Sequence, residues 1–171
     1  MLNPIDTAAV IRDGGAVGHF PGQIHPAVAW WLGSCLIVTT KTDRLAVAHD
    51  GAPISVKFAD RLCRGAINAQ HYACRVRYLG HQPEQTLLDV ATGVLHAPAA
   101  WVSTNGNGNG NEASIVQIRL YNQGGMLLDD ATGLAAIRDL IERDHVPIPV
   151  NTRAKGTIEP WPTEAITGAP S

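Results

Sequence analysis

The chain has 171 residues, a formal net charge of −2 and 45% apolar residues. This length and composition fit one folded domain with a core of ordinary size. The basic residues are interleaved with apolar ones and form no Lys/Arg block, which argues against nucleic acid and anionic membranes as partners.

The elements expected along the chain alternate between strands and helices. In chain order we expect a strand over 8–12, a helix over 26–38, a strand over 45–48, a helix over 55–68, a strand over 72–79, a helix over 83–93, strands over 97–103 and 115–121, and a helix over 129–143. Ser55 is expected to cap the second helix. This alternation predicts an α/β domain of three layers, with a mixed, mostly parallel sheet and helices on both faces. The last strand follows a loop without a helix, so we expect it to pair antiparallel at one edge.

Prolines dominate the chain after residue 146. We therefore expect residues 1–146 to form the α/β domain and residues 147–171 to be a Pro-rich extended or disordered tail. Cys35, Cys63 and Cys74 have no paired spacing and are expected to be buried in a reducing compartment. No signal-peptide pattern or bilayer-length apolar run is evident, which predicts a cytoplasmic protein without a membrane partner.

Four turns follow the expected strands, at 12–15, 49–51, 80–81 and 103–111. Ligands of open parallel sheets bind outside the carboxyl ends of the strands, so these turns should line one rim. The histidines show no paired helical spacing, and no metal site is expected.

Each candidate on this rim has two interpretations. Arg12 either binds a phosphate or pairs with a neighbouring carboxylate at the surface. His49 and Asp50 are either an acid/base pair or parts of an Asp-Gly turn. The Asn/Gly run over 105–111 either presents N–H groups to an anion or is a flexible polar linker.

Several segments resemble, in order, the N-terminal domain of the α-D-phosphohexomutases (phosphomannomutase/phosphoglucomutase). The sequence Val-Ile-Arg-Asp-Gly-Gly at 10–15 resembles the family's opening Asp-Ile-Arg-Gly, and Val-Ala-His-Asp-Gly at 47–51 stands where the family has Val-Gly-Arg-Asp. Val-Ser-Thr-Asn-Gly-Asn at 102–107 falls on Val-Thr-Ala-Ser-His-Asn. Ile-Arg-Leu-Tyr at 118–121 and the helix over 135–141 match the family's Ile-Lys-Leu-Tyr and Ile-x-x-Leu-Ile segments.

The resemblance implies site residues and also marks a departure. In the family the loop serine carries the phosphoryl group, and here Asn105 stands at that position, where an amide cannot form the ester. Ser103 and Thr104 are possible substitutes. The ligand-binding candidates are Arg12, His49, Asp50, Asn107 and Arg119, the last at the position of the family lysine.

The family also uses further domains, one of which supplies a Mg²⁺ loop. We therefore expect no cofactor or metal from this chain, and Mg²⁺ only if a partner supplies that loop. The first hypothesis is a catalytically degenerate, stand-alone phosphohexomutase-like domain that acts as a binding or scaffolding module for a sugar phosphate or a partner enzyme.

A solitary domain of this family must cover the surface that its other domains would pack against. Homo-oligomerisation or a partner protein would do so, with Trp30, Trp31 and Trp101 either at the contact or in the core. The alternative function is one subunit of a split sugar-phosphate mutase, an intramolecular phosphotransferase. A third is a structural protein whose segment 159–162 docks to a partner.

Overall fold

The computed structural model describes residues 5–69, 73–105, 114–146 and 155–160. The strands are β1 (Gly15–Phe20), β2 (Arg44–His49), β3 (Arg75–His81), β4 (Ala99–Asn105), β5 (Ser114–Tyr121) and β6 (Thr157–Pro160). The helices are α1 (Thr7–Val10), α2 (Pro26–Thr40), α3 (Pro53–Ile67), α4 (Glu84–Val90) and α5 (Ala135–Glu142), with helical turns η1 (Ala91–Leu95) after α4 and η2 (Asp130–Leu134) before α5.

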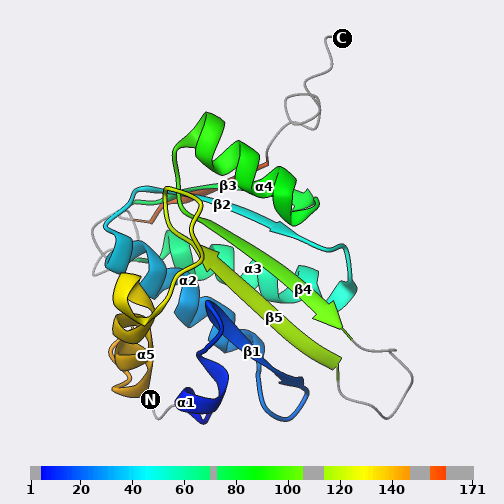
Figure 1. The fold of residues 1–171 in the computed structure, drawn as a ribbon, viewed down its shortest axis with the longest axis vertical. Helices are drawn as coiled ribbons and strands as arrows, with labels where there is room; N and C mark the ends of the chain where they lie inside the picture. Colours follow the sequence, from blue (N-terminus) through cyan, green and yellow to red (C-terminus); the bar gives the residue numbers. More distant parts are fainter. Residues whose placement is uncertain (1–4, 70–72, 106–113, 147–154, 161–171) are drawn as a thin grey trace.

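The strands form one six-stranded sheet in the order β1-β5-β4-β2-β3-β6 (Figure 1). β2 pairs parallel with β3 and β4, and β6 pairs parallel with β3. β5 pairs antiparallel with both β1 and β4, so among the strands of the described residues it alone runs against the others. The predicted mixed, mostly parallel α/β architecture is confirmed.

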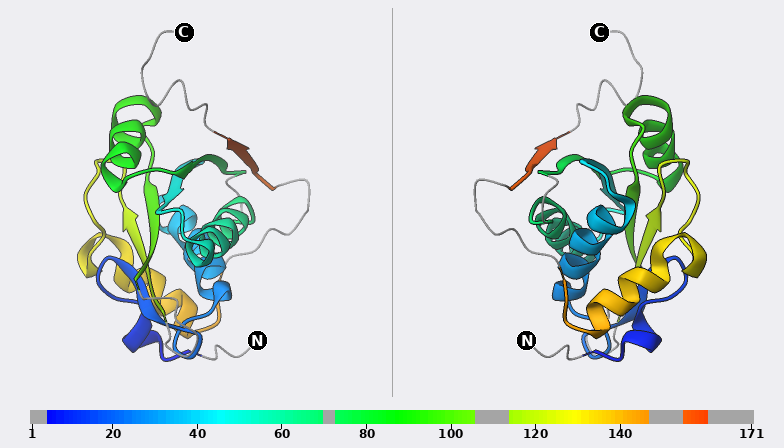
Figure 2. Two further views of the ribbon diagram at one scale, coloured as in Figure 1. Left: turned by 90° about the vertical axis from the view of Figure 1, so that its right-hand side faces the viewer. Right: turned by 90° about the vertical axis from the view of Figure 1, so that its left-hand side faces the viewer.

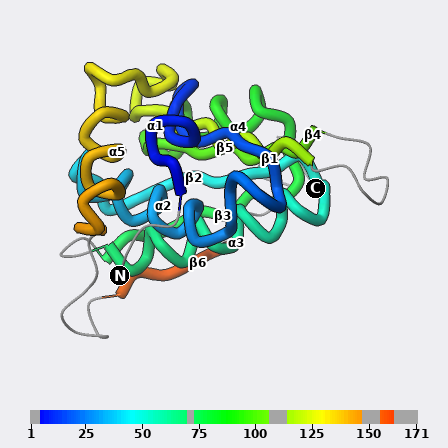
Figure 3. The backbone as a smooth tube through the Cα atoms, turned by 90° about the horizontal axis from the view of Figure 1, so that it is seen from below, coloured from blue at the N-terminus to red at the C-terminus, as the bar shows by residue number. Residues whose placement is uncertain are grey.

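Helices lie on both faces of the sheet, which makes three layers. Figure 2 shows α4 on one side of the sheet and α2 and α3 on the other, and Figure 3 shows the same layers seen from below. α5 packs beside α2. Within the described ranges, no helix has the length and apolar character needed to cross a bilayer.

Residue size on the two faces of the sheet sets how the helices pack. On the side of α2 and α3, large side chains such as Val102 and Ile118 are completely buried. On the side of α4, β2 and β4 present Ala46, Ala48 and Ala99, which make a smaller second core with Leu87 and other residues of α4. Small residues there let the short α4 lie close to the sheet.

The three cysteines are buried, as predicted. Burial raises the pKa of Cys35 and of Cys74 to about 12. Burial also raises the pKa of Cys63. Because the thiolate is the reactive form, these side chains act as small apolar groups in the core.

Two strand expectations are wrong. The segment expected as a first strand, 8–12, is helical because Asp6 caps it by accepting a hydrogen bond from the Ala9 N–H (3.3 Å), and the first strand is Gly15–Phe20. The last strand of the hairpin, Ser114–Tyr121, is antiparallel as expected, but it lies between β1 and β4 instead of at an edge. It is enclosed because β1 pairs along its other side.

Two further expectations also differ from the structure. Ser55 does not cap α3, whose N-cap is Ala52 with Pro53 in the first turn. The expected domain boundary at residue 146 leaves out Thr157–Pro160, which pairs with β3 as the sixth strand of the same sheet. The rest of the expected tail, 147–154 and 161–171, lies outside the described residues.

Glycines set the close approach of α2 and α3. A Cβ added to Gly33 would lie 2.1 Å from the Leu62 carbonyl oxygen, and one added to Gly65 would lie 1.9 Å from the Trp30 carbonyl oxygen. Such contacts are far inside van der Waals distance, and the clashing atoms belong to the backbone and cannot rotate away. The two helices therefore touch through their main chains.

We predict that Gly65→Ala destabilises the protein by roughly 1–2 kcal/mol, because a clash with backbone atoms puts the overpacking cost in the upper part of the usual range of about 1–3 kcal/mol, which exceeds the gain of about 1 kcal/mol in helix propensity. Urea unfolding of the two proteins measures the difference. The control is Gly93→Ala, since nothing lies within 4 Å of the position of that Cβ. Equal midpoints for the two variants would contradict a backbone-to-backbone contact.

Candidate functional site

Asp50 follows β2 and fixes the end of β4. Its Oδ2 accepts a hydrogen bond from the Thr104 N–H (2.9 Å), and its Oδ1 accepts one from the Ala52 N–H (3.0 Å). Burial raises the pKa of this carboxyl, but the hydrogen bonds from Thr104, Ser55 and Ala52, together with His49, outweigh burial and leave the pKa below its ordinary value. The ionised side chain therefore ties β2, β4 and the start of α3 together.

Thr104 makes a second contact through its hydroxyl group. Its Oγ1 lies 2.6 Å from the Oγ of Ser55, in the first turn of α3. Ser103 points to the opposite face of the sheet, because successive side chains of a strand alternate, and it is 8% exposed. Asn105, the last residue of β4, is exposed. The two proposed substitutes for the loop serine thus lie on different faces.

His49 and Asp50 are neighbours, but the structure does not join them as an acid/base pair. The Nδ1 of His49 accepts a hydrogen bond from the Gly51 N–H (3.0 Å), which assigns the proton of the neutral ring to Nε2. Burial lowers the pKa of His49, the nearby His81 lowers it further, and Asp50 opposes this. The buried ring stacks on His81, with 6.3 Å between the centroids. His49 is thus a neutral, buried ring packed against His81 at the end of β2.

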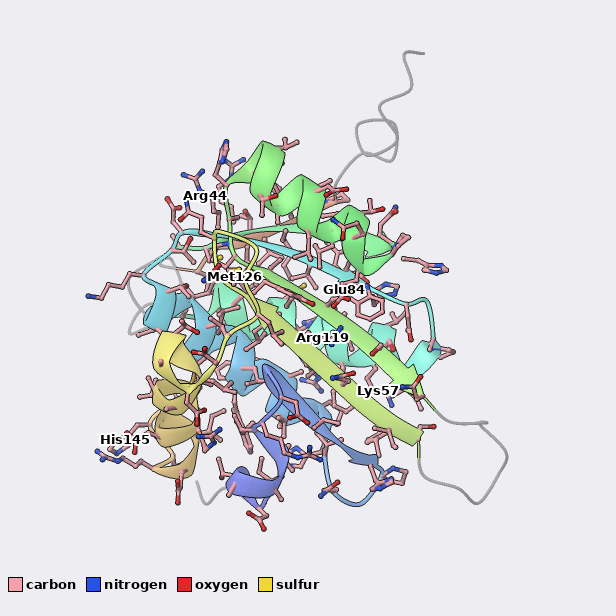
Figure 4. The ribbon with its side chains drawn as sticks, viewed as in Figure 1. Arg44, Lys57, Glu84, Arg119, Met126 and His145 are labelled. Carbon is pink, nitrogen blue, oxygen red and sulfur yellow. The ribbon has the colours of Figure 1, made fainter. Side chains whose placement is uncertain are left out.

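Arg119 of β5 is engaged with the start of α4. Its Nη1 donates to both carboxylate oxygens of Glu84 at 3.0 Å, and the Tyr121 hydroxyl also donates to Glu84. Burial, and then the contact with Glu84, raise the pKa of Tyr121. Figure 4 shows Arg119 and Glu84 next to each other over the sheet. The Nε of Arg119 is buried without a hydrogen-bond partner among the described residues, so this donor takes no part in holding Glu84.

Arg12 and Arg119 line one groove of about 860 Å³. The groove lies between the turn before β1, the face of β5 that carries Gln117 and Arg119, and the segment leading into α5. Its polar lining consists of Arg12, Asp13, Gln117, Arg119, Asp129, Asp130 and Arg138.

Acidic neighbours fix the cations of this groove. Arg12 pairs with Asp13 at 2.6 Å, with both side chains about half exposed. Arg138 donates to the carbonyl oxygen of Ile11 and to Asp130, both at 3.0 Å. The guanidinium groups are thus held in place while the groove keeps both cations and carboxylates at its surface.

The residues expected on a single rim therefore lie at two separate places. His49, Asp50, His81 and the end of β4 lie together at the carboxyl ends of the parallel strands, as predicted. The turn at 12–15 precedes β1 instead of following a strand, so Arg12 lies near the other end of the sheet with Arg119. Asn107 lies outside the described residues.

Sequence reasoning missed Glu84, Tyr121 and Arg138. In the sequence, Glu84 is an acidic residue in the first turn of a helix. That position does not predict a partner elsewhere in the chain. The Arg119–Glu84 pair joins residues 35 positions apart. Arg138 has the pattern of an ordinary position in the last helix, which does not indicate its contacts with Ile11 and Asp130.

We find no group of three or more His, Cys, Asp or Glu side chains placed to hold a metal ion in the described parts of the chain. The carboxylate of Asp50, which contacts the end of β4, is engaged with the backbone, since both of its oxygens accept N–H groups.

Comparison with solved structures identifies a shared fold. A phosphoglucomutase/phosphomannomutase family protein from Burkholderia thailandensis superposes with a TM-score of 0.68 at 14% identity, covering 94% of this chain and 34% of that one. A putative phosphomannomutase from Thermus thermophilus gives a TM-score of 0.60 at 19% identity, with the same coverage of 94% and 34%. No family model and no curated protein matches the sequence.

The fold that the sequence resemblance predicts is thus confirmed. The chain is similar to a domain-sized part of these proteins and spans about a third of their length. At these identities the likeness establishes the fold, whereas the chemistry depends on the residues present at the site.

We predict that Asp50→Asn lowers the free energy of unfolding at neutral pH by roughly 1 kcal/mol, because an amide offers one acceptor oxygen for two N–H groups. The lowered pKa of Asp50 stabilises the fold above its ordinary value of about 3.9, and this contribution is lost as the pH falls through the lower folded value. Urea unfolding between about pH 2 and 7 should therefore show a smaller loss of stability in acid for the variant than for the wild type.

Asp60→Asn is the matched control, since Asp60 is an exposed carboxylate on α3 paired with Arg64. It should change stability by no more than a few tenths of a kcal/mol. An Asp50→Asn protein with the stability and acid profile of the control would refute the role of Asp50 in holding β4.

Proposed function

We propose that this chain is a phosphohexomutase-like domain that binds a sugar phosphate in the groove lined by Arg12, Arg119 and Arg138, and that it does not itself carry the phosphoryl group. The observation that supports this proposal is the chemistry of the groove. Its volume of about 860 Å³ is within the range of small-ligand sites. A hexose phosphate would fit such a volume.

The lining suits both parts of a sugar phosphate. Guanidinium groups present paired N–H donors that match phosphate oxygens, and Arg12 is exposed enough to reach a ligand. Carboxylates accept hydrogen bonds from hydroxyl groups, and Asp13 and Asp130 stand beside the arginines. In the ion pairs Arg12–Asp13 and Arg138–Asp130 at least one of the two side chains is exposed. Replacing the carboxylate with a ligand phosphate therefore costs little free energy.

The proposed loss of phosphoryl transfer is supported by the end of β4. Asn105 stands at the position where the resemblance places the phosphoserine, and its amide cannot form a phosphate ester. The nearest hydroxyl on the same strand, Thr104, is already bonded to Ser55. Arg119, which the resemblance aligns with a lysine of the family, is paired with Glu84.

The groove also suggests how a partner or second copy would dock. Its rim includes Leu127, which is 39% exposed, and the adjacent Met126 is 66% exposed. Apolar side chains next to an open sheet face suit a protein contact. Of the three tryptophans considered for this role, Trp31 is in the core and Trp30 and Trp101 are half-buried, the last with its Nε1 donating to the Gln82 carbonyl oxygen (3.0 Å).

We predict that mannose 6-phosphate or glucose 1-phosphate raises the melting temperature of the protein, whereas the free hexose does not. A ligand that binds only the folded state adds about 2.7 kcal/mol of stability at a hundredfold excess over its Kd. Arg12→Ala should weaken binding by roughly ten- to a hundredfold, because a hydrogen-bonded charge contact contributes about 1.5–3 kcal/mol.

The matched control is Arg64→Ala, which removes an exposed arginine of α3 that pairs with Asp60 and does not line the groove. It should bind like the wild type. Sugar phosphates that leave the melting temperature unchanged, or that shift it equally in the two variants, would overturn the proposal.

A second candidate function is one part of a split mutase. It is favoured by the double anchoring of Thr104, which fixes the point where the chain leaves β4. On this account the chain gains one phosphoryl group when mixed with Mg²⁺, a hexose bisphosphate and a phosphomannomutase that lacks the part equivalent to this chain. Intact-mass measurement tests it, and Thr104→Val and Ser103→Ala identify the acceptor. An unchanged mass in the complete mixture would refute this candidate.

A further inference from the structure

Three arginines gather at the start of β2 and β3, on the face that carries α4. Arg44 stands directly opposite Arg75 in the parallel register. Arg75 and Arg77 are two positions apart on β3, so their side chains point to the same face. Neighbouring strands are about 4.8 Å apart, and alternate residues of one strand about 7 Å, so three positive charges are concentrated here. Like charges placed opposite each other repel unless anions compensate them.

The three side chains line a pocket of about 270 Å³. Asp43 and Leu45 also line it, and Val94, Leu95 and Ala97, from η1 and the segment after it, form its apolar wall. Figure 4 shows Arg44 well separated from Arg119. The pocket therefore lies outside the groove proposed for the sugar phosphate and has no residue in common with it.

Glu159 of β6 compensates one side of this cluster. Its carboxylate accepts hydrogen bonds from the Nε and Nη2 of Arg75 at 3.0 and 3.1 Å, and lies 3.4 Å from Arg77. The pKa of Glu159 is lowered to about 2, chiefly by Arg75. β6 borders β3 on the side away from β2. The anion supplied by β6 therefore serves Arg75 and Arg77.

Arg44, on the β2 side, has weaker compensation. Its Nε lies 3.3 Å from Asp43, the preceding residue, and both side chains are more than half exposed. Its Nη1 donates to the Leu95 carbonyl oxygen (3.2 Å), which turns the guanidinium toward the pocket wall. In the described ion pairs of this cluster, three arginines share the carboxylates of Asp43 and Glu159, beside a concave surface that includes apolar side chains.

We propose that this pocket binds a phosphate monoester, with the phosphate between Arg44 and Arg77 and the organic group against Val94 and Leu95. Planar guanidinium groups match phosphate oxygens, and an anion between strands removes the repulsion between neighbouring arginines. The carboxylate of Glu159 lies beside the phosphate position and competes with it for the guanidinium groups.

The test is a titration of the Arg12→Ala protein with phenyl phosphate and with inorganic phosphate at low ionic strength, followed through the arginine Nε–H signals in NMR spectra. The Arg12→Ala background weakens the other phosphate site. Saturable shifts of the Arg44 and Arg77 signals are expected, with tighter binding of phenyl phosphate because of its apolar ring. Equal affinity for the two probes would overturn the role of the apolar wall, and shifts that chloride reproduces would overturn the site.

Two variants locate the anion. Arg44→Ala, made in the same background, should weaken binding about tenfold, while Arg64→Ala should leave it unchanged. Glu159→Gln should strengthen binding several-fold, since it removes the competing charge and leaves the side chain the same size. Equal affinities for Arg44→Ala and Arg64→Ala would contradict the proposal, as would weaker binding by Glu159→Gln.

Discussion

The direction of β5 is the constraint on which the arrangement of this protein depends. β5 runs against β1 and β4 and pairs with both, so the end of β5 lies beside the start of β1. That pairing brings Arg119 next to Gly15, just after the turn that carries Arg12. The three parallel strands β2, β3 and β4 end at the opposite side of the sheet, where Asp50 binds Thr104. One reversed strand thus separates an arginine-lined groove from an anchored strand end.

Much of the fold could be predicted because its signals are local. Pro26 at a first helical turn, the apolar run of β2 and the spacing of the α3 core residues each mark an element within a few residues. The first strand was placed too early in the chain, because the apolar residues of 8–11 are too few to show the periodicity of a helix or of a strand. The cap by Asp6 makes this segment helical. β6 escaped because its evidence is the distant pair of Arg75 with Glu159, together with the approach of Gly156 to Cys74.

The candidate site was predicted only in part, for the same physical reason. The rule that ligands bind at carboxyl ends of parallel strands correctly placed Asp50 near Thr104. It failed for Arg12, because a turn that precedes a strand lies at the other end of the sheet. The partners that orient the arginines (Glu84 for Arg119 and the Ile11 carbonyl oxygen for Arg138) are far away in sequence and have no local signal.

We propose that the groove of Arg12, Arg119 and Arg138 receives the phosphate of a sugar phosphate. A crystal structure of the full chain with mannose 6-phosphate tests it most directly, because it locates the anion. We expect a phosphate oxygen at a hydrogen-bond distance of about 2.7–3.2 Å from the Arg12 guanidinium, with sugar hydroxyls on Asp13 or Asp130. A sugar phosphate held elsewhere on the protein, with Arg12 still paired to Asp13 as in the free chain, would contradict it.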